Sequence, residues 1–284
     1  CQYSAVDGVP QDWHLVHLGQ FAFSGPGLIF IEATGVEPQG RITLGCTGLY
    51  NDATEQAFSR IIDFIKSVGD VAVGIQLGHA GRKGSTVEPW EGGGMIEGNG
   101  AWHPQAPSAV PYLPGWPAPD PMSNDNLCRV KQAFVDATRH AHRAGFDTIQ
   151  VHVAHGYLLH QFLSPITNKR SDQYGGDLQS RMRYPLEIFE AVRGAFPSEK
   201  PVMVRLSATD WIDGGWDIGQ SIEFCRALKD LGCDMVDVSS GGLDQAQQII
   251  TGPGYQTDLS QRIRSEAGIA TMTVGQITDP IQAE

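Results

Sequence analysis

The sequence has no apolar run that approaches the roughly 20 residues a membrane-spanning helix requires, and its five cysteines include no C-x-x-C pair. An odd number of cysteines without that spacing predicts reduced thiols in a cytoplasmic protein and argues against a disulfide framework or a zinc site. Positive charge is scarce, because 20 lysines and arginines stand against 32 aspartates and glutamates, a net charge of −12. This imbalance argues against nucleic acid and anionic membranes as partners.

The chain of 284 residues is long enough for one large domain, and its short apolar segments alternate with amphipathic stretches of helical period. The expected strands are residues 27–33, 71–77, 146–153, 201–206, 233–238 and 270–274. The expected helices are residues 51–68, 123–144, 178–195, 217–231 and 257–267. Gly69, Gly145 and Gly232 stand where helices should end, and we expect left-handed C-terminal conformations there. The alternation predicts parallel βαβ units.

Two α/β architectures, a doubly wound sheet and a closed (β/α)8 barrel, satisfy this alternation. No G-x-G-x-x-G follows the first expected strand, so the dinucleotide fingerprint of the doubly wound fold is missing. Polar residues instead stand at the ends of nearly every strand, namely Glu32, Gln76, His79, His152, His155, Arg205, Ser239 and Ser240. Such convergence of strand ends is typical of the TIM barrel. We therefore predict a barrel as a single domain over residues 1–284, with a loop insertion at 85–122.

Two histidines and a tyrosine follow one another where the expected strand 146–153 runs into a glycine-containing loop. Imidazoles donate hydrogen bonds and a phenol is a weak acid. His152, His155 and Tyr157 are therefore suited to bind a carbonyl or nitro oxygen and to deliver a proton beside it. The alternatives are histidines of the core, or a metal-dependent barrel hydrolase that uses His152 and His155 together with His79.

Taken with four other motifs, this stretch resembles the Old Yellow Enzyme family of flavin-dependent ene-reductases, and within it the thermophilic-like or xenobiotic reductase class. The other motifs are Cys1-Gln2-Tyr3, Glu32-Ala33-Thr34, residues 75–82 (IQLGHAGR) and Val204-Arg205-Leu206-Ser207. The resemblance covers essentially the whole chain. It places Cys1 just after the first barrel strand and Glu284 in the seventh helix. We therefore expect a fragment that lacks the first and last strands, and whose start, without methionine, is not a natural one.

The resemblance implies FMN as the cofactor and assigns Cys1, Ala33, Gln76 and Arg205 to its binding. Arg205 supplies a permanent positive charge, which stabilises the negative charge of a reduced flavin. Gln76 can donate and accept hydrogen bonds along the pyrimidine edge of the ring, and Ala33 is small enough for close approach. Cys1 matches a thiol that modulates the flavin without a covalent bond.

The resemblance also implies that Tyr3, His152 and His155 bind the substrate. The two histidines match a pair that polarises the electron-withdrawing oxygen while hydride reaches the β-carbon. Tyr157 matches the general acid that protonates the α-carbon, with solvent as the rival donor. Ser239, Gly241, Gly242 and Gly275 could offer backbone N–H groups to the FMN phosphate, whereas the family's arginine anchor lies beyond Glu284.

The function expected from these residues is an FMN-dependent oxidoreductase that takes hydride from NADPH or NADH. It would reduce activated C=C bonds of α,β-unsaturated carbonyl or nitro compounds. The expected partners are small molecules, with neither nucleic acid nor membrane, and the full-length protein is expected to form a homo-oligomer. A metal-dependent hydrolase and a non-catalytic flavin-binding relative are the alternatives.

Overall fold

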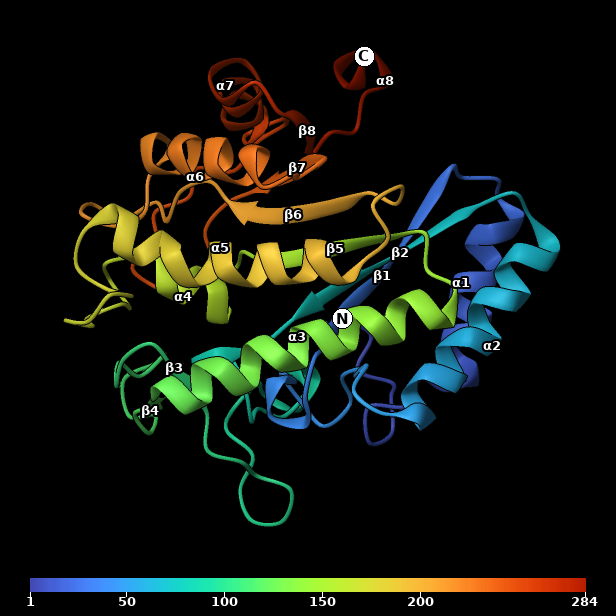
Figure 1. The fold of residues 1–284 in the computed structure, drawn as a ribbon, viewed down its shortest axis with the longest axis horizontal. Helices are drawn as coiled ribbons and strands as arrows, with labels where there is room; N and C mark the ends of the chain where they lie inside the picture. The colour runs from blue at the N-terminus through green and yellow to red at the C-terminus, as the bar shows by residue number, and fades with distance from the viewer.

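The computed structural model describes residues 1–284 and contains one large parallel sheet with helices outside it (Figure 1). The strands of this sheet are β1 (Leu28–Gly35), β2 (Ala72–Gly78), β5 (Thr148–Val153), β6 (Val202–Ser207), β7 (Met235–Ser239) and β8 (Ala270–Thr273). The helices are α1 (Asp12–Phe23), α2 (Asp52–Val68), α3 (Asn124–Ala144), α4 (Leu158–Leu163), α5 (Leu178–Ala195), α6 (Ile218–Asp230), α7 (Thr257–Ala267) and α8 (Pro280–Ala283). All six expected strands and all five expected helices are present.

The sheet follows the order of a barrel. Its strands lie in the sequence β1-β2-β5-β6-β7-β8, and every neighbouring pair is parallel. The helices pack in the same order, α1 on α2, α2 on α3, α3 on α5, α5 on α6 and α6 on α7 (Figure 1). The two edge strands, β1 and β8, each pair with one neighbour only. The architecture is therefore the predicted α/β fold of the barrel type, with six consecutive parallel strands.

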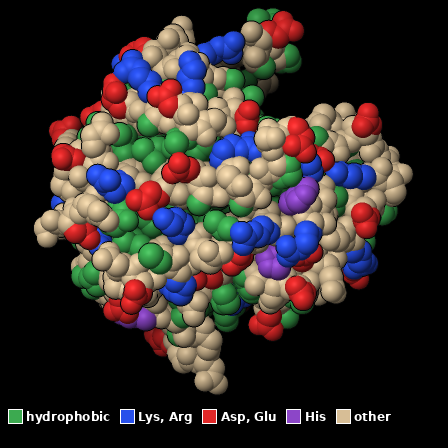
Figure 2. Space-filling view, viewed as in Figure 1, with side chains coloured by type: hydrophobic (Ala, Val, Ile, Leu, Met, Phe, Trp, Pro, Cys, Tyr) green, Lys and Arg blue, Asp and Glu red, His purple; other side chains and the backbone are tan.

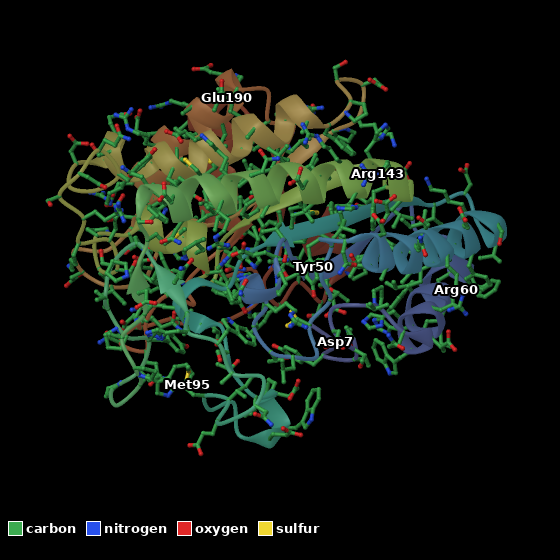
Figure 3. The ribbon with its side chains drawn as sticks, turned by 60° about the horizontal axis from the view of Figure 1, so that its bottom comes forward. Asp7, Tyr50, Arg60, Met95, Arg143 and Glu190 are labelled. Atoms are coloured by element: carbon green, nitrogen blue, oxygen red, sulfur yellow. The ribbon has the colours of Figure 1, made fainter.

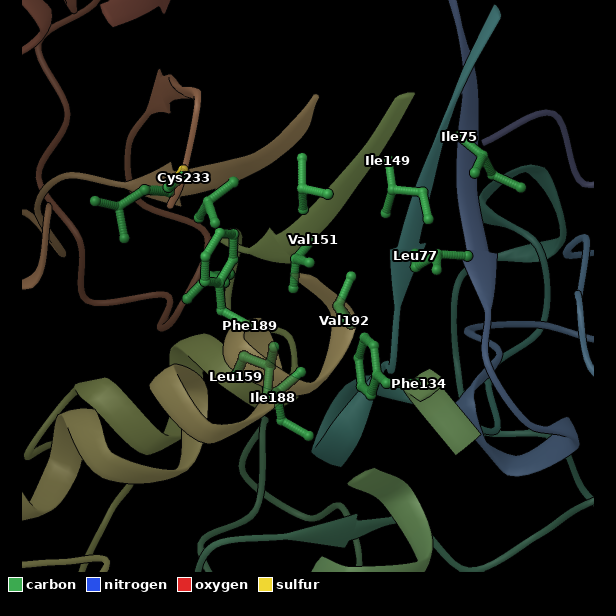
Figure 4. Close-up of a cluster of buried hydrophobic side chains, with 14 of the residues drawn as sticks. Ile75, Leu77, Phe134, Ile149, Val151, Leu159, Ile188, Phe189, Val192 and Cys233 are labelled. Atoms are coloured by element: carbon green, nitrogen blue, oxygen red, sulfur yellow. The ribbon is translucent and has the colours of Figure 1, made fainter. Parts of the chain in front are cut away.

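The two faces of the sheet carry different side chains, because successive residues of a strand point to opposite faces. Ile75 and Leu77 of β2 and Ile149 and Val151 of β5 point outward. There they meet apolar side chains of α3 and α5, such as Phe134 (Figure 4). The residues between them point to the inner face and are polar. The outer face thus packs the core, and the inner face is free to carry chemistry.

Helix caps fix where these elements begin and end. The side chains of Asn51 and Ser123 accept hydrogen bonds from backbone N–H groups in the first turns of α2 and α3. Gly145 and Gly232 adopt the expected left-handed conformation, with φ of 96° and 86°. Gly69 does not, since its φ of −160° is extended backbone, and the expectation for this residue is wrong.

Three features were not expected from the sequence. Helix α1 is apolar around most of its circumference and shows no amphipathic period. Helix α4 is only 6 residues long, too short for periodicity to reveal. Two short strands, β3 (Gln105–Ala106) and β4 (Asp120–Pro121), pair within the insertion 85–122, which also contains the 3-10 turn η3 (Pro89–Glu91). Two further 3-10 turns are η1 (Pro38–Gly40) and η2 (Gly81–Lys83).

The surface is varied in charge and shape. Figure 2 shows Lys and Arg side chains intermingled with Asp and Glu over the helix-covered face.

The insertion, which contains Met95, projects from the body of the molecule on the opposite side from Glu190 of α5 (Figure 3). None of the helices is both long and apolar enough to cross a membrane.

Candidate active site

Polar side chains from four neighbouring strands meet on the inner face of the sheet. Gln76 of β2 lies opposite Gln150 of β5, His152 of β5 opposite Arg205 of β6, and Arg205 opposite Asp237 of β7. Because the strands are parallel and in register, residues that are far apart in sequence become neighbours in space. These five residues line one side of a cavity of about 420 Å³.

The cavity brings together seven of the eight site residues expected from the sequence. They are Cys1, Ala33, Gln76, His152, His155, Tyr157 and Arg205. The eighth, Tyr3, lines an adjoining cavity of about 180 Å³ that shares Tyr157 with the first. Residues 86, 87, 89, 93, 112 and 116 of the insertion line this second cavity. The insertion therefore lies beside the site.

His152 is held as a neutral hydrogen-bond donor. The backbone N–H of Ala154 donates to its Nδ1 at 3.2 Å, so in the neutral ring the proton resides on Nε2. Burial of the ring lowers the pKa of His152 well below its usual value, and the positive charge of Arg205 adds to the effect. The ring therefore stays uncharged at neutral pH.

His155 stands at a right angle to His152, with ring centroids 5.2 Å apart. Its Nε2 lies 2.8 Å from the Ser239 hydroxyl. Burial, together with the charge of Arg205, lowers the pKa of His155 to about 3. Two neutral imidazoles thus line one cavity, an arrangement that suits binding of a polarised oxygen without full positive charge.

The backbone at His155 is strained, and side chains hold it in place. Its φ of 57° is left-handed, a conformation that costs a non-glycine residue of order 1–3 kcal/mol. The Ser207 hydroxyl accepts a hydrogen bond from the His155 N–H at 2.9 Å. The Lys83 ammonium donates to the His155 carbonyl at 3.0 Å and to the Gly242 carbonyl at 3.1 Å. Neither backbone group of His155 depends on regular secondary structure.

The next residue, Gly156, is held in the same way. Its N–H donates to Nδ1 of His160 at 2.9 Å, and its carbonyl accepts from the Gln161 amide at 2.7 Å. His160 is fully buried and places Nε2 2.8 Å from the carboxylate of Asp210. The carboxylate thereby fixes the tautomer of His160, and His160 positions the loop that carries His155 and Tyr157.

Tyr157 occupies the boundary between the two cavities. Its ring centroid is 5.0 Å from that of His152, and the Lys83 Nζ lies 5.0 Å from the ring. Burial raises the pKa of the phenol above its usual range, so the hydroxyl carries its proton at neutral pH. Burial also lowers the pKa of Lys83 to about 8. Sequence reasoning did not assign this lysine a place at the site.

A chain of polar contacts crosses the floor of the cavity. The Gln76 side-chain amide donates from Nε2 to Oε1 of Gln150 at 2.6 Å, and Nε2 of Gln150 donates to Asp237 Oδ2 at 3.1 Å. Arg205 Nη1 lies 3.4 Å from the same carboxylate oxygen. Arg205 Nε and Asp237 Oδ1 are buried without a partner, which is rare unless a ligand completes the site.

Gln150 and Asp237 were not expected from the sequence. Their signal was available, because Gln150 alternates with the apolar residues of β5 at the same inward parity as His152, and Asp237 alternates with Val236 and Val238 of β7. The expected phosphate donors are partly wrong. The Gly241 N–H donates to the Thr209 carbonyl and the Gly242 N–H to the Gln247 side chain, so neither is free for a ligand.

The metal-hydrolase alternative does not fit this geometry. His79 Nε2 lies 3.0 Å from Glu37, and its Nδ1 accepts the Gly81 N–H. His79, His152 and His155 do not converge. The one group of three metal-type ligands whose atoms lie within 4.8 Å of one another is Asp52, Glu55 and His140, residues of α2 and α3 that do not line the cavity.

Known proteins are similar to this chain over all the strands whose residues line the cavity. A family model described as the NADH:flavin oxidoreductase / NADH oxidase family matches residues 1–284. NADH:flavin oxidoreductase FG08077 of Gibberella zeae is 42% identical over 94% of this chain and 69% of its own length. NADPH dehydrogenase of Geobacillus thermodenitrificans is 40% identical over 100% of this chain and 79% of its own. The solved structure of morphinone reductase matches with a TM-score of 0.80 at 27% identity, over 99% of this chain and 76% of its own.

Proposed function

Because this chain belongs to the NADH:flavin oxidoreductase / NADH oxidase (Old Yellow Enzyme) family and is an oxidoreductase of the NADPH dehydrogenase type, we propose that it uses bound FMN to reduce activated C=C bonds. The substrates are α,β-unsaturated carbonyl or nitro compounds. Family membership makes it an NAD(P)H-dependent flavin oxidoreductase, as the sequence led us to expect. The cavity residues support the finer proposal.

The residues of the cavity suit an isoalloxazine ring. Gln76 and Gln150 present amides on its floor, Arg205 and Asp237 have unpartnered polar atoms there, and Ala33 leaves room for a flat ring. When bound in this cavity, FMN would supply the hydride-transfer chemistry between NAD(P)H and the β-carbon of the substrate. The guanidinium of Arg205 stabilises the extra negative charge of the reduced ring.

The two histidines bind and polarise the substrate oxygen. His152 Nε2–H donates a hydrogen bond, and His155 beside it shares the task. As hydride reaches the β-carbon, negative charge accumulates on this oxygen, and donors that are already in place stabilise it. Tyr157 holds its proton at neutral pH and delivers it to the α-carbon. Cys1 lines the cavity and Tyr3 lines the adjoining one, where they would contact the ring and the substrate respectively.

The observation that carries this proposal is the pair of neutral histidines facing a cavity in which the buried Nε of Arg205 has no partner. The test uses the full-length protein under anaerobic conditions. Titration with NADPH should bleach the flavin absorbance, and 2-cyclohexenone should restore it, whereas saturated cyclohexanone should not. A colourless protein, or a bleached flavin that the enone fails to reoxidise, would contradict the proposal. The expected homo-oligomer stays a prediction, to be tested by light scattering.

A further inference from the structure

Asp237 is a buried acid in the floor of the cavity that the proposed reaction does not use. It lies in the middle of β7, and its side chain is 3% exposed. Its Oδ2 accepts from the Gln150 amide and lies 3.4 Å from Arg205 Nη1. Its Oδ1 has no partner although it is buried. Burial of a carboxylate costs desolvation free energy unless an opposite charge and hydrogen bonds compensate it.

The neighbouring charge is the cation expected to stabilise reduced flavin. Arg205 and Asp237 are register partners on β6 and β7, so their distance is fixed by the sheet and not by flexible loops. Arg205 contacts no other carboxylate within 4.0 Å. A negative charge this close cancels much of the field that the guanidinium projects into the cavity, because charges interact strongly where water is excluded.

The other ionisable groups of the cavity are placed differently. The Glu32 carboxylate accepts a hydrogen bond from the Gln2 N–H and lies 3.2 Å from His14. Lys83 lines the adjoining cavity and donates to two backbone carbonyls. Both His152 and His155 are neutral. Asp237 is therefore the one acid in direct contact with Arg205. Burial raises the pKa of its carboxyl group, and the Arg205 charge and the Gln150 hydrogen bond act against that rise.

From this pairing we propose that Asp237 is a positioning residue that limits the effective positive charge of Arg205 and thereby lowers the reduction potential of the bound flavin. Gln150 holds the carboxylate in place through its hydrogen bond to Oδ2, and Gln76 in turn donates to Gln150. The inference rests on the proposed function, since it assumes that FMN occupies this cavity. A lower potential would favour transfer of hydride onward to the substrate over retention of electrons on the flavin.

The decisive measurement is the midpoint potential of FMN bound to the full-length protein and its variants, by equilibration with reference dyes. Asp237→Asn keeps the shape and removes the charge. At a fixed solution potential, it should increase the ratio of reduced to oxidised flavin at least about tenfold. For a two-electron couple this corresponds to a rise of about 30 mV in the midpoint potential. Asp237→Glu keeps the charge and should stay near the natural potential.

Two controls separate charge from structure. Asp234→Asn removes one negative charge just before the same strand, where Asp234 pairs with Arg193 and not with Arg205, and it should leave the potential unchanged. The double variant Arg205→Gln/Asp237→Asn removes both charges, and its flavin midpoint potential should be lower than that of Asp237→Asn. Should Asp237→Asn unfold, Asp237→Ser against Asp237→Glu makes the same comparison.

The outcomes are distinct. A potential in Asp237→Asn equal to that of the natural protein overturns the inference. Equal shifts in Asp237→Asn and Asp237→Glu also overturn it, because they would show a structural role alone. If the natural protein binds FMN and reduces enones but the variants give either of these two results, the proposed function stands and only the role of Asp237 fails. A natural protein that binds no FMN overturns both.

Discussion

Replacement of His152 by alanine should slow enone reduction far more than flavin reduction. In the natural protein the Ala154 N–H fixes the ring so that Nε2 carries the proton, and burial keeps the ring neutral. The ring is therefore a donor that needs no reorganisation when negative charge develops on the substrate oxygen. Hydride transfer from NADPH to the flavin develops no such oxyanion.

The size of the effect follows from the geometry. One preorganised donor to a developing oxyanion is worth roughly 10²–10³ in rate, so the rate of enone reduction should fall by that factor. The substitution also leaves the buried Ala154 N–H without its partner, which costs about 1–3 kcal/mol of folding free energy. This second loss affects stability, and it should leave the flavin content unchanged below the unfolding transition.

Anaerobic stopped-flow absorbance measures the two half-reactions separately. His103→Ala is the matched control. His103 lies in the insertion, its side chain is 49% exposed, and it pairs with Asp120. The His103→Ala variant should carry out both half-reactions at the natural rates. If His152→Ala reduces 2-cyclohexenone at the natural rate, His152 does not bind the substrate oxygen. If both half-reactions slow equally, its effect is on the flavin or on the fold.

Three further predictions concern neighbouring residues. Arg205→Ala should lower the flavin potential and weaken FMN retention, and it should destabilise the fold by about 3 kcal/mol because Asp237 loses its partner; unchanged potential and flavin content would place Arg205 away from the ring. Tyr157→Phe should slow reduction of enones more than that of nitroalkenes, whose nitronates can be protonated in water, and equal slowing would indicate a binding role. The pKa of folded His155, about 3, lies below the value of about 6.5 in an unfolded chain. Only the unfolded state therefore takes up this proton as the pH falls from about 6.5 to 3, and the contribution of His155 to stability is lost by about 1.4 kcal/mol per pH unit. Urea titrations of His155→Asn should show a shallower loss over this range, and identical slopes would contradict the assignment.

The barrel order and most of the cavity could be predicted from the sequence because both depend on local patterns. Apolar segments of strand length alternate with amphipathic helices, and the residues that end or interrupt those strands must meet when the strands are parallel. His152, His155, Gln76 and Arg205 therefore reached one cavity as expected. Their assigned roles stay predictions.

The parts that were missed depend on contacts distant in sequence. Lys83 reaches a carbonyl 72 positions away at His155 and one 159 positions away at Gly242, and no pattern around Lys83 indicates either. Asp210 reaches His160 across 50 positions. Helix α1 was missed for a different reason, since a helix that is apolar around most of its surface has no period for a sequence pattern to detect.

We propose that one cavity holds the flavin and places the substrate oxygen between two neutral histidines. It is tested most directly by a crystal structure of the full-length protein with FMN and 2-cyclohexenone. We expect the flavin ring to lie over Gln76 and Arg205, with the carbonyl oxygen about 3 Å from His152 Nε2. Flavin bound elsewhere, or a carbonyl directed away from both histidines, would contradict it.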